Sequence, residues 1–112
     1  MLEKFEAYQI AKHYYWICKS LKLPKFLHDQ LIRASSSIAL NLAEGSGKRT
    51  PIDQRRFYTI AFGSLRECQA ILELERVENE ALIKMGNQLG AILYTLSRKS
   101  IPPKTEPKLH PI

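Results

Sequence analysis

Two glutamates in helical segments, Glu44 and Glu67, are the side chains best placed for general acid–base chemistry or for binding a pair of metal ions. Each lies beside the apolar stripe of its segment, together with other polar residues. The whole polar set is Ser37, Asn41, Glu44, Ser64 and Glu67. Di-metal helical bundles also need Glu-x-x-His pairs, and none of the three histidines follows a glutamate by three positions. We therefore expect neither a metal nor another cofactor.

The polar set also has a structural interpretation. If the two segments pair antiparallel, Glu44 lies near the start of the later segment and Glu67 nearer its other end, so close contact between them is not expected. Asparagine and glutamate can instead bond across helices or pair with an arginine such as Arg33, and such groups can fix helix register or an oligomer interface. We expect a protein that is not an enzyme. Catalysis by Asn41, Glu44 and Glu67 is the alternative.

The stretch AEGSGKRTP, residues 43–51, resembles a phosphate-binding loop at first sight. A Walker loop requires Gly-x-x-x-x-Gly-Lys-[Ser/Thr] between a strand and a helix. Here Leu42 stands where the first glycine should be, and Arg49 replaces the residue whose hydroxyl binds magnesium. The preceding segment also has helical period. We therefore interpret the stretch as a turn between two helices.

Cationic side chains surround this turn. Lys48 and Arg49 precede the next helix, and its first two turns carry Arg55 and Arg56. Free N–H groups and the dipole at a helix N-terminus attract anions, and the chain has a net charge of +6. We expect a nucleic-acid interface that contacts phosphates and not base edges. The alternative is that the charges only keep the loop soluble. The expected set is Lys48, Arg49, Arg55, Arg56, Arg98 and Lys99.

Four segments with helical period must position these residues, and no segment alternates like a strand. They span about residues 3–23, 25–44, 51–76 and 80–99. Gly45 is expected to end the second segment in a left-handed conformation. Thr50 should cap the third and Pro51 should open it, with Asp53 near the positive end of the helix dipole. The short connections predict an all-α, antiparallel up-down-up-down four-helix bundle.

The spacing of apolar residues predicts which face of each segment is buried. For the third segment the expected stripe is Phe57, Ile60, Ala61, Ser64, Leu65, Cys68, Ile71 and Leu72. In the fourth, Gly86 and Gly90 lie one turn apart. Because glycine inside a helix costs about 1 kcal/mol relative to alanine, this pair indicates close approach by a neighbouring helix.

Length and composition predict one domain without a membrane span or signal peptide. The chain has 112 residues, and it contains no run of about 18 apolar residues. We expect the bundle to occupy residues 1–101, a Pro-rich basic tail to occupy residues 102–112, and the location to be cytoplasmic. Cys18 and Cys68 should be reduced core residues. The apolar faces are wider than an isolated bundle needs, notably at Trp16 and Phe57, so apolar surface should remain on the monomer and favour self-association.

The stretch from Leu31 to Glu67 carries a specific combination of residues. Its elements are Ser37-Ile38-x-x-Asn41-x-x-Glu44-Gly45, then Phe57, Ala61 and Gly63-Ser64-x-x-Glu67. Ala7 to Ala11 and the pair Leu23-Pro24 fit the same pattern. This combination resembles the bacterial four-helix-bundle family first met as short reading frames in intervening sequences of 23S ribosomal RNA genes.

The resemblance implies an up-down bundle that assembles into a ring-like homopentamer. The chain is similar to the accessory variability proteins of diversity-generating retroelements, which are basic pentamers that bind a reverse transcriptase and nucleic acid. No catalytic residues are implied. The leading hypothesis is an oligomeric bundle that binds RNA or DNA through a basic surface, as an accessory factor. The alternative is a scaffold for a protein such as a reverse transcriptase, with no direct contact to nucleic acid.

Overall fold

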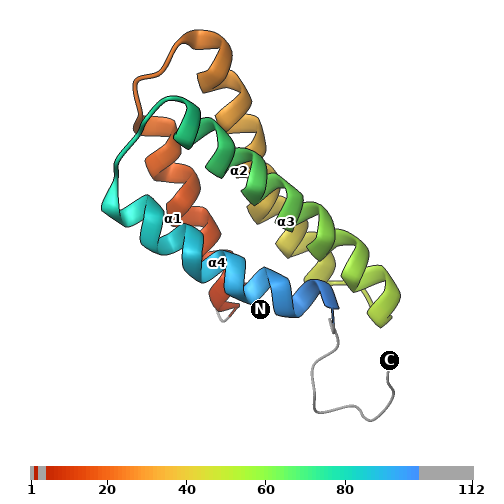
Figure 1. Cartoon of the computed structure of the whole chain (residues 1–112). Coiled ribbons are helices and arrows are strands. Elements are labelled where there is room, and N and C mark those ends of the chain that lie inside the picture. Colours follow the sequence, from red (N-terminus) through yellow and green to blue (C-terminus); the bar gives the residue numbers. More distant parts are fainter. Residues whose placement is uncertain (1, 3–4, 99–112) are drawn as a thin grey trace.

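The computed structural model of the chain describes residue 2 and residues 5–98, and this part is helical throughout apart from its turns (Figure 1). The four helices are α1 (Glu6–Ser20), α2 (Lys25–Ser46), α3 (Pro51–Leu74) and α4 (Glu80–Arg98). The prediction of four helices and no strand is confirmed for the described residues. Lys99 and the expected tail at residues 102–112 lie outside them. Within residues 5–98, no helix combines the length and the apolar character needed to span a membrane.

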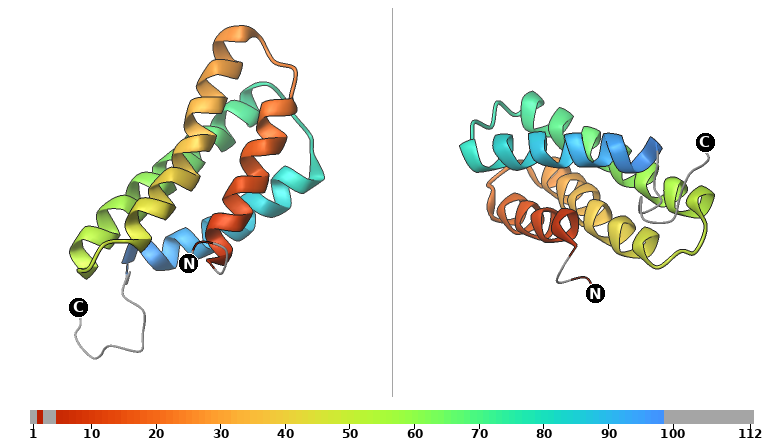
Figure 2. Two further views of the ribbon diagram at one scale, coloured as in Figure 1. Left: turned by 180° about the vertical axis from the view of Figure 1, so that it is seen from behind. Right: turned by 90° about the horizontal axis from the view of Figure 1, so that it is seen from below.

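The helices form a closed four-helix bundle. Each helix packs against its neighbours in the sequence, and α1 also packs against α4 (Figure 2). The interface between α2 and α3 is the most extensive. Because the chain direction alternates from helix to helix, the α2–α3 turn lies at the same end of the bundle as the end of α4. The α1–α2 and α3–α4 connections lie at the other end.

Local signals in the sequence set several helix ends. The Thr50 side chain caps α3 by accepting a hydrogen bond from the Asp53 backbone N–H at 3.1 Å, and Pro51 is the first helical residue. Both predictions are confirmed. Asn79 caps α4 in the same way, because its side-chain oxygen accepts a hydrogen bond from the Leu82 N–H at 3.0 Å. Helix α1 is shorter than the expected span of residues 3–23 at both ends.

The prediction that Gly45 ends α2 in a left-handed conformation is wrong. Helix α2 continues to Ser46, Gly47 follows it, and no glycine of the described residues has a positive φ. Gly45 is instead buried inside the helix, where the Tyr58 ring of α3 packs directly on its backbone. A Cβ at this position would lie 2.6 Å from Cε1 of Tyr58. Glycine is needed here for close contact between helices and not for its backbone freedom.

The buried face of α3 is rotated relative to the predicted stripe. Ala61, Leu65, Cys68 and Ile71 are buried as expected, but Ile60 is 51% exposed. Gln54 and Tyr58 are buried in its place, which the sequence analysis did not anticipate. The reason is the partner helix: the space above Gly45 accepts a large ring, so the helix turns Tyr58 inward and leaves Ile60 outside.

Two further predictions about the core concern the glycines of α4 and the two cysteines. Gly86 is buried, and a Cβ there would lie 3.1 Å from Nε2 of Gln69 and 3.7 Å from the Tyr14 ring, so the expected close approach is confirmed. Gly90 makes only ordinary contact with Leu65. Cys18 and Cys68 are both buried and unbonded to each other, and burial raises the pKa of the Cys18 thiol to about 12. Both thiols therefore remain protonated and unreactive.

Candidate nucleic-acid interface

Three members of the polar set join α2 to α3. The Ser64 hydroxyl donates a hydrogen bond to the Ser37 hydroxyl at 2.8 Å. The Asn41 amide donates to the same hydroxyl oxygen at 3.0 Å and to the Ser37 backbone carbonyl at 2.8 Å. All three groups are partly buried, so the network replaces bonds to water and fixes the register of the two helices. No nucleophile or base is assembled by it.

The two glutamates of the set are engaged by different cations. Glu67 forms an ion pair with Arg33 of α2, which links the same two helices as the serine pair. Glu44 forms an ion pair with Lys48 one turn later, with 3.3 Å between the charged atoms. Among the described residues, no group of three His, Cys, Asp or Glu side chains is arranged to hold a metal ion. The glutamates thus act as partners for cations within the bundle.

The cations around the α2–α3 turn differ in how much of their charge is free. The Lys48 ammonium lies near Glu44 and also 5.1 Å from the centre of the Phe57 ring. Arg56 lies 3.6 Å from Asp53. Arg49 is exposed and Arg55 is half-buried, and neither pairs with an acidic side chain of the described residues. Arg49 and Arg55 therefore carry most of the uncompensated charge at this turn.

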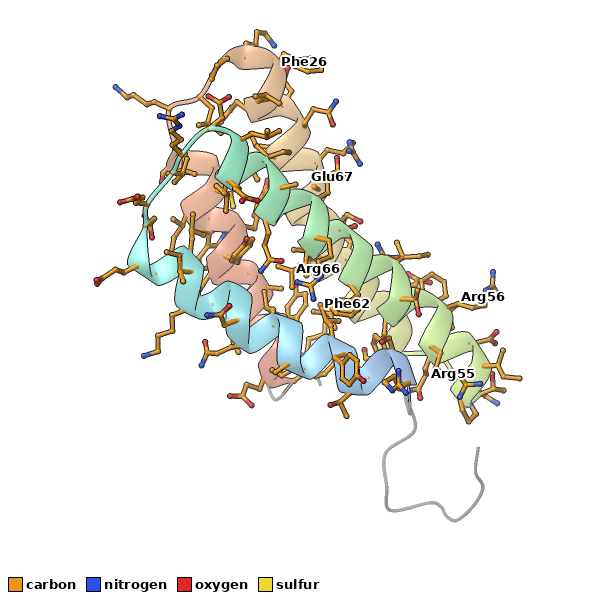
Figure 3. All side chains as sticks on the ribbon, in the orientation of Figure 1. Phe26, Arg55, Arg56, Phe62, Arg66 and Glu67 are labelled. Atoms are coloured by element: carbon orange, nitrogen blue, oxygen red, sulfur yellow. The ribbon has the colours of Figure 1, made fainter. Side chains whose placement is uncertain are left out.

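The end of α4 adds a further cation to the same end of the bundle. Arg98 is exposed on the last residue of α4, and its guanidinium lies 4.9 Å from the centre of the Tyr94 ring. The side chain of Arg55 extends toward the end of α4, whereas Arg56 points away from the bundle (Figure 3). Lys99, the sixth residue of the expected set, lies outside the described residues. The bundle thus brings four of the expected cations to its α2–α3 turn and a fifth close to it.

The sequence analysis missed a second group of cations, which lies on α1. The Lys12 ammonium lies 5.6 Å from the ring centres of both Tyr8 and Trp16. The Lys19 ammonium lies 5.3 Å from the ring centre of Tyr15. The signal was present in the sequence, because aromatic residues and lysines alternate between positions 8 and 19 at spacings of three and four. Of these rings, the sequence analysis considered only Trp16, as apolar surface for self-association.

A cleft of about 300 Å³ lies beside the α3–α4 turn, at the opposite end from the α2–α3 turn. Its lining includes Gln69, Asn87 and the fully buried Tyr14. The Tyr14 hydroxyl has no hydrogen-bond partner among the described residues, and burial raises its pKa well above the usual range. The hydroxyl is therefore neutral, and the cleft lies apart from the cations of the candidate interface.

Comparison with known proteins identifies the family. No curated protein and no solved structure gives a significant match to the chain. The family model for the 23S rRNA-intervening sequence protein matches residues 4–99, which includes all four helices and the whole polar set. The chain therefore belongs to the 23S rRNA-intervening sequence protein family.

Proposed function

We propose that this protein is a non-enzymatic, oligomeric bundle that binds nucleic acid through the phosphate backbone. The observation that carries the proposal is the set of cations at one end of the bundle. Arg49 and Arg55 lie at the start of α3, Arg98 lies at the end of α4, and none pairs with an acidic side chain of the described residues. Lys48 and Arg56 add charge that Glu44 and Asp53 partly compensate.

Several physical features favour phosphate as the ligand of this surface. Arginine binds phosphate with two parallel hydrogen bonds and stays charged at any physiological pH. The N-terminus of α3 contributes the positive end of its dipole, although Pro51 has no N–H and the N–H of Asp53 is already bonded to Thr50. The family name refers to intervening sequences of 23S rRNA, which agrees with a nucleic-acid-associated role. The sequence has no motif that reads base edges, so binding should depend on charge and little on sequence.

The outer face of the α2–α3 pair supports the oligomeric part of the proposal. The contacts Ser37–Ser64 and Arg33–Glu67 define an antiparallel register that places Leu40 at the level of Ile60, and Phe26 at the level of Leu74. These four side chains are 65%, 51%, 71% and 72% exposed. Apolar side chains exposed at two levels of one helix pair form a surface that association would bury. A ring-like homo-oligomer, a pentamer by family resemblance, is the assembly we propose.

The same apolar face favours the second candidate function, a scaffold for another protein such as a reverse transcriptase. Leu40 and Ile60 would then contact the partner, and the cations would serve solubility. Capture of a protein partner that persists after nuclease treatment would support the scaffold. Loss of the partner on nuclease treatment would instead indicate that nucleic acid links the two.

The proposed function predicts strongly salt-dependent binding. Fluorescence anisotropy of labelled structured RNA and of duplex DNA should show binding at about 50 mM salt that weakens at least tenfold at about 200 mM, because counterions are released from each neutralised phosphate. The molecular mass of the protein should be measured in the same buffers, so that dissociation of the oligomer is not mistaken for loss of affinity. Absence of binding at the lower salt concentration would contradict the proposal and favour the scaffold.

A further inference from the structure

One face of α1 combines aromatic rings with lysines. Tyr8, Lys12, Tyr15, Trp16 and Lys19 share one side of the helix, because each lysine lies three or four residues from the rings beside it. The buried residues of α1, Ala7, Ala11, Tyr14 and Cys18, occupy a different side. From Tyr8 to Lys19 this face extends roughly 16 Å along the helix axis. We call these five residues the α1 face.

The lysines of the α1 face lie over its rings. Lys12 lies between Tyr8 and Trp16 at 5.6 Å from each ring centre, and Lys19 lies 5.3 Å from the ring centre of Tyr15. His13 adds an edge-on contact to Trp16, with 5.1 Å between the ring centres. A ring that is already oriented loses less conformational entropy when a ligand stacks on it. The α1 face is therefore better prepared for stacking than a set of free aromatic side chains.

Exposure leaves these rings accessible to a ligand. Trp16 is 52% exposed, and Tyr8 and Tyr15 are half-buried, so each side chain keeps part of its surface open to a ligand. Buried aromatic residues such as Tyr14 and Tyr58 offer no such surface. Partly exposed tyrosine and tryptophan rings of this kind are common at binding interfaces.

The charge of the α1 face suits a polyanion. Glu6 is the acidic residue of α1, and it lies six residues before Lys12 and on a different side of the helix. Lys22 and Lys25 continue the positive charge toward the start of α2, where Asp29 is paired with Lys25 at 2.8 Å. Phosphates would therefore approach the rings without repulsion from a carboxylate on the same face.

The lysines also argue against a second copy of this protein as the occupant. Two α1 faces packed together would bring Lys12 and Lys19 against the same cations of the partner, which costs free energy when the charges are desolvated. The apolar pairs on α2 and α3, such as Leu40 and Ile60, suit self-association better because they carry no charge.

We propose that the α1 face binds single-stranded nucleic acid, by stacking unpaired bases on Trp16 and the two tyrosines while Lys12 and Lys19 contact the phosphates. This inference rests on the proposed function and assigns it a second surface, distinct from the cations of the α2–α3 turn. Stacking on aromatic rings tolerates any base and is combined with cationic contacts in proteins that bind single strands. A duplex hides its bases and would use only the cationic end of the bundle.

The chain provides its own reporter for this surface. Trp16 is the single tryptophan of the sequence, so its fluorescence reports on the α1 face alone. Titration of the full-length protein with an oligothymidine or oligouridine of about ten nucleotides should quench this fluorescence in parallel with binding measured by anisotropy. Duplex DNA of the same length should bind with much weaker quenching. Binding of the single strand without any quenching would overturn the proposal.

Two pairs of variants test the residues individually. Trp16→Ala should weaken binding of the labelled oligothymidine roughly tenfold and leave duplex binding within about twofold. Ile83→Ala is its control, because Ile83 is 56% exposed on α4. Lys12→Ala should weaken single-strand binding by about twofold to fivefold, against the control Lys84→Ala on α4. Thermal unfolding of each variant checks that the bundle still folds.

The outcomes separate this inference from the proposed function. Equal single-strand affinity of Trp16→Ala and Ile83→Ala, with duplex binding retained, would overturn the α1 face and leave the proposed function intact. Failure of both nucleic acids to bind at low salt would overturn both. A blue shift of Trp16 fluorescence with anionic phospholipid vesicles, without quenching by the oligonucleotides, would assign the α1 face to a lipid surface and also overturn the inference.

Discussion

Replacing Gly45 by alanine should destabilise the folded bundle by about 1–3 kcal/mol, although glycine to alanine inside a helix usually stabilises. The added methyl group would lie 2.6 Å from Cε1 of Tyr58. The Tyr58 ring is only 3% exposed, so it cannot move into solvent and must displace other parts of the core. This cost exceeds the gain of about 1 kcal/mol in helix propensity.

Gly63 provides the matched control for Gly45. It also lies inside a helix, but a Cβ at this position would meet no atom within 4 Å. Gly63→Ala should therefore stabilise the protein by about 0.5–1 kcal/mol. The two free energies of unfolding should be measured by chemical denaturation of both variants and the wild type. A Gly45→Ala variant as stable as Gly63→Ala would show that Tyr58 does not pack on Gly45.

Placing glutamate at both Leu40 and Ile60 should dissociate the proposed oligomer at micromolar protein concentration. Burial of a leucine or isoleucine side chain contributes about 1.5–3 kcal/mol, so each protomer would lose that contribution at two positions. In addition, two carboxylates would have to be desolvated in every interface. Both residues are more than half exposed on the protomer, so the fold itself should tolerate the change. Mass in solution, by light scattering after size-exclusion chromatography, should fall to that of a monomer.

The control for this variant carries glutamate at Ile83 and Tyr94 on α4. These residues are 56% and 53% exposed, so the control changes a comparable apolar area and the same charge. It should keep the mass of the wild type. An unchanged mass for the Leu40 and Ile60 variant would exclude the outer face of α2 and α3 as the interface. Dissociation of both variants would show that added charge, and not the position, is responsible.

The four-helix architecture could be predicted because it depends on local signals. Apolar spacing marks each helix, and Thr50 with Pro51 specifies the start of α3 through backbone bonding that needs no distant partner. Gly45 shows where such reasoning fails. A glycine near the end of an apolar stripe fits both a helix terminator and a close contact between helices. Only the position of Tyr58, thirteen residues later in the chain, distinguishes the two.

The predicted face of α3 failed for a related reason. Phe57 and Tyr58 are adjacent, and so are Ile60 and Ala61, so an apolar stripe can be drawn through either member of each pair. The sequence of α3 alone does not select between the two stripes. The neighbouring helices select the stripe that contains Tyr58 and bury the polar Gln54 with it. Hydrophobic period identifies a helix reliably, but its rotation by one residue depends on the surfaces against which it packs.

The sequence identified the cations of the candidate site, but the analysis did not foresee which of them pair with acidic residues. The spacing of Glu44 and Lys48 by four, and of Asp53 and Arg56 by three, would have indicated that two of the cations have acidic partners close by in the sequence. The proximity of the α4 terminus to the start of α3 follows from the antiparallel bundle. The α1 face was missed because aromatic residues in a helix suggest a core, although the spacing of three and four between these rings and the lysines was visible in the sequence.

The most direct test of the proposed nucleic-acid interface compares two variants that each remove two positive charges. One is Arg49→Ala with Arg55→Ala, at the cationic end of the bundle. The other is Lys84→Ala with Arg76→Asn, at the opposite end, where asparagine tolerates the positive φ of 55° that Arg76 adopts. Affinity for duplex DNA at about 50 mM salt, measured by anisotropy, is the quantity to compare. The account predicts a loss of at least tenfold and a shallower salt dependence for the first variant, with little change for the second. Equal losses in the two variants, or none in either, would contradict it.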